Sequence, residues 1–190
     1  MLPRADFLLQ LRSLRQTVVE GGLHPLLLGL YEFGHRYVTG APPQRYSRIT
    51  PQLYVSGQHR RHGWAQLAAL GITAVVNLRQ EYDDAAAGIA PLRYLYLPTI
   101  DATPPSLEHL RAGVEFIRQE IARGGKVYVH CAAGIGRAPT LAAAYLVSTG
   151  LTPTQAWQHI LLVRPFVRPT HRQKAIVERF AEQQGDKDQV

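Results

Sequence analysis

The fold is decided by one stretch, residues 126–147, which reads KVYVHCAAGIGRAPTLAAAYLV. Its first part, through Val129, is rich in β-forming residues and predicts a short buried strand. The apolar run from Ala138 to Val147 predicts a helix. The segment between them contains two glycines and is too short for anything but a tight loop. The stretch therefore predicts a strand, a loop and a helix N-terminus in succession.

We call residues 131–137 the cysteine loop, and their composition is typical of an anion-binding site. Backbone N–H groups converge in such a loop, and the dipole of the following helix favours negative charge there. Its glycines allow the backbone to approach an oxyanion closely. We expect phosphate to be bound by the residues between the cysteine and the helix, which are Ala132, Ala133, Gly134, Ile135, Gly136 and Arg137.

Three side chains at this loop predict nucleophilic chemistry on phosphorus. Cys131 lies at the base of the loop, where a thiol readily becomes the reactive thiolate. Arg137 can hold two phosphate oxygens with its planar fork as charge develops. His130 has two interpretations: its ring orients the loop through a hydrogen bond, or it is a satisfied core histidine.

A phosphatase also needs a general acid to protonate the leaving oxygen. Asp101 is the main candidate, because it follows a predicted strand at residues 94–97 and precedes a helix that begins near Ser106. Loops at the carboxyl ends of parallel strands line the ligand crevice of α/β sheets. The competing carboxylic acids follow the strand at residues 72–78 and are Glu81, Asp83 and Asp84.

The rest of the chain alternates between strand and helix patterns. Short strands are predicted at residues 53–55, 72–78 and 94–97, and helices at residues 64–70 and from Ser106 to about Gly124. Two capping boxes, which open at Thr152 and Thr170, predict two further helices. This order predicts an α/β fold with a single central, mostly parallel sheet of about four or five strands and helices on both faces, preceded by an N-terminal helical segment.

His130-Cys131, five further residues and Arg137 resemble the signature loop of the cysteine-based phosphatases. Over residues 46–183 the chain is similar to their dual-specificity branch, which acts on phosphotyrosine and on phosphoserine or phosphothreonine. The resemblance implies a metal-independent, cofactor-free phosphomonoesterase with a phosphocysteine intermediate. It also implies that Asp101 acts first as acid and then as base.

Two subgroups of that branch are similar for different reasons. Tyr46-Ser47-Arg48-Ile49 and Gln80-Glu81-Tyr82 resemble mitochondrial-type phosphatases of phosphatidylglycerophosphate. The cysteine loop with its continuation to Pro139 is closer to glucan phosphatases. The expected partner is thus an anionic phosphorylated protein, lipid or glycan, and the contrasting hypothesis is a non-catalytic phosphate-binding module.

One position departs from the family pattern. Many members follow the arginine with Ser or Thr, whose hydroxyl helps the thiolate leave in the second step, but this chain has Ala138. We expect either slower hydrolysis of the intermediate or a replacement for the hydroxyl by Thr140 or a water molecule.

Charge and composition restrict the partners further. The net charge is +7, and residues 1–62 contain eight Arg against three acidic residues. Residues 1–40 are expected to form an amphipathic helical extension that packs on the main domain or rests on anionic lipid. The basic residues show no aromatic interleaving or reader motif, so nucleic acid is not expected. Arg164, Arg168 and Arg172 form either a basic rim or a set of solvated helix-end cations.

The expected organisation is an extension at residues 1–40, a phosphatase domain at residues 41–185 and a frayed tail at residues 186–190. The chain has one cysteine, which permits no internal disulfide. This fits a reducing intracellular compartment, in the cytoplasm or at a membrane surface. Arsenate reduction by a related loop is disfavoured, because it needs further thiols.

Overall fold

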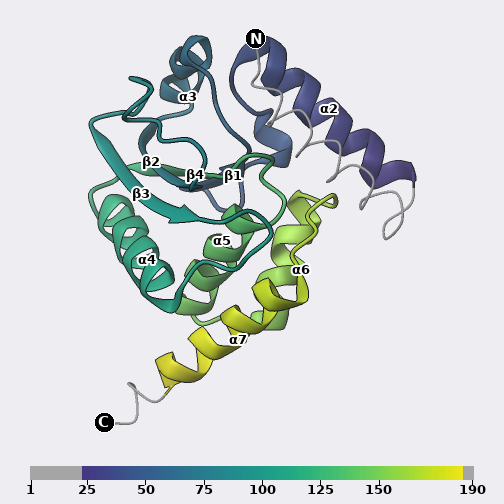
Figure 1. Ribbon diagram of the computed structural model, residues 1–190, viewed down its shortest axis with the longest axis vertical. Helices are drawn as coiled ribbons and strands as arrows, with labels where there is room; N and C mark the ends of the chain where they lie inside the picture. The colour runs from purple at the N-terminus through teal and green to yellow at the C-terminus, as the bar shows by residue number, and fades with distance from the viewer. Residues whose placement is uncertain (1–22, 186–190) are drawn as a thin grey trace.

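The computed structural model describes residues 23–185 and shows one parallel sheet flanked by helices (Figure 1). The strand order is β1-β4-β2-β3, and each neighbouring pair is parallel. The predicted α/β fold with a mostly parallel sheet is confirmed. The strands are β1 (Leu53–Ser56), β2 (Ile72–Arg79), β3 (Arg93–Thr99) and β4 (Lys126–His130).

Three of the described helices begin at side-chain caps that the sequence provides. Ser106 Oγ accepts the N–H of His109, and the capping box of Thr152 is formed with both of its hydrogen bonds. Thr170 and Gln173 make the same reciprocal pair. Each cap satisfies N–H groups that have no partner within their own helix. The helices are α2 (Leu23–Thr39), α3 (Trp64–Ala69), α4 (Leu107–Ala122), α5 (Arg137–Ser148), α6 (Pro153–Val163) and α7 (His171–Gly185), with short 3₁₀ turns at Gln44–Tyr46 and Arg61–Gly63.

The two faces of the sheet bury alternate residues of each strand. In β4, Val127 and Val129 belong to the large core under α4, α5, α6 and α7, whereas Tyr128 points to the opposite face. Tyr128 packs there with Leu67 of α3 in a smaller cluster. Full burial of a Val or Leu side chain contributes roughly 1.5–3 kcal/mol, so the larger cluster dominates stability. This core fixes the strand ends from which the loops of the site emerge.

Helix α5 lies at the centre of the larger core. Its residues 137–147 are all buried, which the apolar run in the sequence anticipated. Because all four strands are parallel, the loops that follow them emerge at one edge of the sheet, together with the N-terminus of α5. A ligand crevice is expected at such an edge.

Helix α2 lies along the outside of the molecule (Figure 1). It ends at Thr39, directly before Gly40, whose φ is +79°. Glu32 and Arg36 are nevertheless buried. Residues 1–22 of the predicted extension and the predicted frayed tail lie outside the described residues. Within residues 23–185 no helix is both long and apolar enough to cross a bilayer.

Candidate active site

The cysteine loop folds back over the sulfur of Cys131. The N–H of Gly134 donates to Cys131 Sγ, with an N···S distance of 3.3 Å. Gly134 has a φ of +71°, and a Cβ at this position would come within 2.2 Å of the backbone carbonyl carbon of Ser56. Glycine is therefore required here, both by the backbone conformation and by the close approach of β1.

The carbonyl oxygens of the loop are held on its outer side. In a peptide unit, the C=O group and the N–H group of the following residue point in opposite directions. Carbonyls that are held outward therefore favour N–H groups that face the sulfur of Cys131. The outer bonds are Gln58 N to Ala132 O (3.1 Å), Arg164 Nη2 to Gly134 O (3.1 Å) and Arg168 N to Ile135 O (2.9 Å).

The helix start adds further donors to this arrangement. Helix α5 begins at Arg137, and Gly136 provides no side-chain cap. The first N–H groups of a helix lack intrahelical partners and favour an anion. The structure thus brings together residues 132–137 around Cys131 as an anion cradle, while their binding of phosphate stays a prediction.

Arg137 is anchored by Glu81, which follows β2. Nη1 and Nη2 donate to the two carboxylate oxygens of Glu81, both at 2.9 Å, and Nη1 also donates to Thr99 O at 2.8 Å. Burial alone would raise the pKa of Glu81, but the hydrogen bonds and charge of Arg137 outweigh it and lower that pKa to about 2. Glu81 is therefore ionised and fixes the plane of the guanidinium.

Asp101 lies on the same guanidinium. Its Oδ1 is 2.9 Å from Arg137 Nη2. Among the described residues, the buried Nε of Arg137 has no hydrogen-bond partner. Nε and Nη2 form one edge of a guanidinium, so an oxyanion can bind Arg137 there once Asp101 moves off Nη2.

The competing carboxylic acids are buried or are held by other hydrogen bonds. Asp83 Oδ1 accepts the hydroxyl of Tyr94 at 2.8 Å, and Asp84 is fully buried. Glu81 uses both oxygens on Arg137. The side chain of Asp101 is the more accessible of the two on Arg137, 45% exposed against 31% for Glu81. The geometry therefore favours Asp101 as the carboxyl group that can reach a leaving oxygen.

His130 belongs to a buried cluster behind the loop. Its Nε2 lies 2.8 Å from Asp84 Oδ2, and His59 Nε2 lies 3.0 Å from the same oxygen. Gln58 Nε2 donates to Asp84 Oδ1 at 2.8 Å. Burial alone would raise the pKa of Asp84, but the charge and hydrogen bond of His130, followed by those of His59, lower it. The orienting role predicted for His130 thus has a concrete partner that the sequence did not identify.

His59, Asp84 and His130 also have the donor types of a metal site. The Nδ1 atoms of both histidines are buried and have no partner among the described residues. If a metal ion were bound by Nε2 of both histidines, each ring would carry its proton on Nδ1, which has no hydrogen-bond acceptor nearby in the described part of the chain. Metal-bound histidines almost always donate that proton. The residues therefore fit a hydrogen-bonded cluster, with Nε2–H on both rings and Asp84 as acceptor, better than a metal centre.

Thr140, the candidate replacement for the missing hydroxyl at position 138, is buried in α5. Its Oγ1 donates to Gly136 O at 2.9 Å. That bond keeps the hydroxyl within the helix start rather than on the sulfur.

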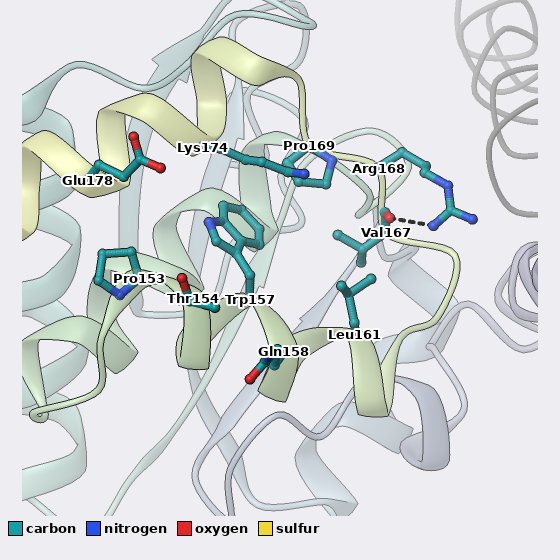
Figure 2. Close-up of a pocket in the computed structure, with 10 residues that line it drawn as sticks. All are labelled: Pro153, Thr154, Trp157, Gln158, Leu161, Val167, Arg168, Pro169, Lys174 and Glu178. Atoms are coloured by element: carbon teal, nitrogen blue, oxygen red, sulfur yellow. Dashed lines mark hydrogen bonds between the residues drawn. The ribbon is translucent and has the colours of Figure 1, made fainter.

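Arg164 is fully buried, so it is neither part of a basic rim nor a solvated helix-end cation, and both predictions are wrong for this residue. Arg168 is half-buried, and its Nη1 donates to Pro165 O and Val167 O. It borders a cavity of about 480 Å³ between α6 and α7, which Trp157, Leu161 and Lys174 also line, and its side chain points away from these residues (Figure 2). Of the three arginines only Arg172 lies exposed in the way a rim requires.

A family model for the catalytic domain of the dual specificity phosphatases matches residues 53–183. The chain belongs to this family. It is similar to Dual specificity protein phosphatase 5 of Homo sapiens, with 34% identity over 135 residues, covering 70% of this chain and 34% of that protein. Phosphatidylglycerophosphate phosphatase PTPMT2 of Arabidopsis thaliana is 30% identical over 146 residues, covering 74% of this chain and 64% of that protein. This dual specificity phosphatase chain thus spans about a third of the first relative and under two thirds of the second.

The fold comparison agrees with this assignment. A crystal structure of PTPMT1 superimposes with a TM-score of 0.67 and 26% identity, covering 75% of this chain and 98% of that chain. The predicted resemblance to the dual-specificity branch and to phosphatidylglycerophosphate phosphatases is confirmed.

Proposed function

We propose that this dual specificity phosphatase hydrolyses phosphate monoesters with Cys131 as nucleophile. The observation that carries the proposal is the N–H of Gly134 directed at Cys131 Sγ, in a loop whose carbonyls are held outward. Donors arranged in this way stabilise both a thiolate and the equatorial oxygens of a phosphate.

In the first step, Sγ attacks phosphorus and an S–P bond forms as the ester P–O bond breaks. Arg137 binds two phosphate oxygens through Nε and Nη2. Asp101, displaced from Nη2 by the substrate, gives its proton to the departing alkoxide or phenoxide. His130 and Asp84 act only through the position of the loop.

In the second step, a water molecule attacks the phosphocysteine. Asp101, now a carboxylate, takes a proton from this water, the S–P bond breaks, and Cys131 thiolate and inorganic phosphate result. No metal or cofactor takes part. Since Thr140 donates to Gly136 O, the leaving sulfur depends on the loop amides and on water for its stabilisation.

Changing Asp101 to Asn removes the transferable proton and leaves the size of the side chain almost unchanged. We expect kcat for phenyl phosphate to fall about 10²-fold or more, because general acids contribute roughly 10²–10⁴. Esters with acidic leaving groups need less protonation and are expected to lose less. Rates of phosphate release across a series of aryl phosphates would measure this difference.

Glu108→Gln is the matched control, since Glu108 is an exposed acid in the first turn of α4. An equal loss for all leaving groups in Asp101→Asn would assign the residue to substrate binding instead of proton transfer.

We propose phospholipid head groups as the substrate class. The Arabidopsis thaliana relative is named as a phosphatidylglycerophosphate phosphatase, and α2 presents an exposed apolar stripe. Positions i, i+4, i+8 and i+15 lie on one helical face. The stripe is formed by Leu23, Leu27, Tyr31 and Val38, the last of which is 76% exposed.

Arginines flank this stripe. The guanidinium of Arg60 lies 4.6 Å from the ring centroid of Tyr37, and that of Arg45 lies 5.4 Å from Tyr46, whose ring contacts Tyr31. Apolar side chains bordered by cations match the surface of an anionic membrane. Peripheral membrane contact thus stays a proposal for α2, as does residence in a reducing compartment.

The double variant Leu27→Glu and Val38→Glu tests the membrane contact. Each replaced side chain forfeits roughly 1–2 kcal/mol of apolar burial, so binding to vesicles with phosphatidylglycerol is expected to weaken at least about tenfold. Hydrolysis of phosphatidylglycerophosphate in those vesicles should fall in parallel, and hydrolysis of a soluble aryl phosphate should not.

Leu162→Glu is the control, because Leu162 is an exposed apolar residue of α6 rather than α2. Equal sedimentation of wild type with phosphatidylglycerol and pure phosphatidylcholine vesicles would contradict the membrane proposal. Preference for phosphopeptides over every phospholipid tested would instead favour a protein substrate, in line with the human relative.

A further inference from the structure

Three charged side chains that the proposed chemistry does not use are buried behind the cysteine loop. Glu32 and Arg36 of α2 are 2% and 5% exposed, and Arg164, which ends α6, is 0% exposed. Charged side chains are almost never buried unless they are paired. Two cations and one anion in one place leave an excess of positive charge beneath the loop.

Glu32 is the acceptor that holds this cluster together. Its Oε1 accepts from Ser56 Oγ and from Arg36 Nε (3.3 Å), and lies 3.9 Å from Arg164 Nη2. Burial alone would raise the pKa of Glu32, but the charges of Arg36 and Arg164, followed by the hydrogen bond of Ser56, lower it. Glu32 is therefore a carboxylate placed between two guanidinium groups.

Arg164 connects this carboxylate to the catalytic loop. Its Nη2 donates to Gly134 O at 3.1 Å, and its Nη1 donates to Tyr46 O. Gly134 is the residue whose N–H points at Cys131 Sγ. The carbonyl that Arg164 holds belongs to the next peptide unit, which joins Gly134 to Ile135, so Arg164 turns the Ile135 N–H to the other side, towards the inside of the loop. Arg164 in turn lies beside Glu32.

Arg36 makes a second connection. Its Nη1 donates to Gln58 O at 2.9 Å, and the N–H of Gln58 donates to Ala132 O at 3.1 Å. Gly57, between the end of β1 and Gln58, leaves no room for a side chain: a Cβ there would meet both Ala132 O and the Arg36 guanidinium at 2.6 Å. One arm of the cluster therefore ends directly on a carbonyl of the cysteine loop, and the other reaches such a carbonyl through Gln58.

We infer that Glu32 is a positioning residue for the phosphatase reaction, because it holds Arg164 on the Gly134 carbonyl and so fixes the Gly134–Ile135 peptide of the loop that surrounds Cys131 Sγ. Helix α2 is then a working part of the catalytic unit, although it precedes the region that the family model matches. The inference rests on the proposed function in that Cys131 is taken as the nucleophile.

Glu32→Gln tests this inference, because it keeps the shape of the side chain and removes its charge. Two buried guanidiniums then face each other without a counter-ion, and Arg164 is expected to leave Gly134 O. We expect kcat for an aryl phosphate to fall about 10-fold to 100-fold, since small displacements of catalytic groups have effects of that order. The rate of Cys131 alkylation by iodoacetamide should fall with it, while KM changes less.

Two further variants separate positioning from folding. Arg164→Lys keeps the positive charge but removes the planar guanidinium, and we expect it to lower kcat and the alkylation rate as much as Glu32→Gln does. Ser56→Ala removes only one hydrogen bond to Glu32, and we expect a smaller decrease in both rates. The controls are Glu182→Gln and Arg179→Lys, which change exposed residues of α7. Circular dichroism and thermal unfolding identify any variant that fails to fold. If Glu32→Gln and Arg164→Lys do not fold, the kcat and alkylation rate of Ser56→Ala are compared with those of wild type instead.

Folded Glu32→Gln and Arg164→Lys proteins with wild-type kcat and wild-type alkylation rates would overturn the inference, even if both melt at lower temperature. Alkylation needs no turnover, so it stays informative if wild type hydrolyses none of the phosphate esters. That last result would overturn the proposed function alone.

Discussion

Replacing Cys131 by serine is expected to abolish phosphate release. A serine hydroxyl in the same place has no general base among the loop amides and is a much weaker nucleophile than a thiolate. Removal of a catalytic nucleophile lowers kcat by about 10⁴-fold or more. Release of inorganic phosphate from an aryl phosphate without added metal, compared with wild type, measures the effect.

The chain offers an unusually clean control for this variant, because Cys131 is its only cysteine. Iodoacetamide can therefore modify wild type at one thiol only, and Cys131→Ser should take up none. Inorganic phosphate is expected to protect wild type from alkylation, because it occupies the cradle. A Cys131→Ser protein that still hydrolyses the ester at a substantial share of the wild-type rate would show that another group attacks phosphorus.

The features that the sequence predicted well are local. The strand, loop and helix at residues 126–147 follow from β-forming residues, two glycines and an apolar run, and each needs only its neighbours in the chain. The capping boxes at Thr152 and Thr170 are local in the same sense. Asp101 was a strong candidate because the carboxyl ends of parallel strands share one edge, so topology alone places its loop near Cys131.

The features that the sequence did not reveal depend on pairs that are distant along the chain. Nothing in the pattern around Glu32 links it to Arg164, which was grouped with two neighbouring arginines at the surface. Likewise, Asp84 was a competing general acid, and its place between His59 and His130 appears only when β2 and β4 are side by side. Buried ion pairs leave no periodic signal, since a single charged residue within an apolar stretch can face either way.

Glu81 is an instructive intermediate case. The sequence placed it on the correct loop and offered it as a proton donor. In the structure Glu81 is instead an acceptor for Arg137, because a carboxyl group with a pKa of about 2 has no proton to donate near neutral pH. Its bond with Arg137 means that the arginine meets substrate with its plane already fixed.

Changing Arg137 to Lys is therefore expected to have the second large effect. Lysine keeps one positive charge, but an ammonium group cannot bind Glu81 and phosphate with two separate edges. We expect kcat/KM for aryl phosphates to fall about 10³-fold or more, because interactions that follow charge into the transition state contribute on that scale. Steady-state kinetics, together with loss of phosphate protection of Cys131 against alkylation, would measure it.

Glu81→Gln gives the comparison that isolates orientation. It leaves the guanidinium in place and removes only the carboxylate that fixes its plane, so its loss should be clearly smaller than that of Arg137→Lys. Both proteins must first be shown to fold, since Arg137 is buried. If Arg137→Lys kept near wild-type kcat/KM, charge alone would suffice at this position. The edge formed by Nε and Nη2, which Asp101 occupies at Nη2, would then have no part in catalysis.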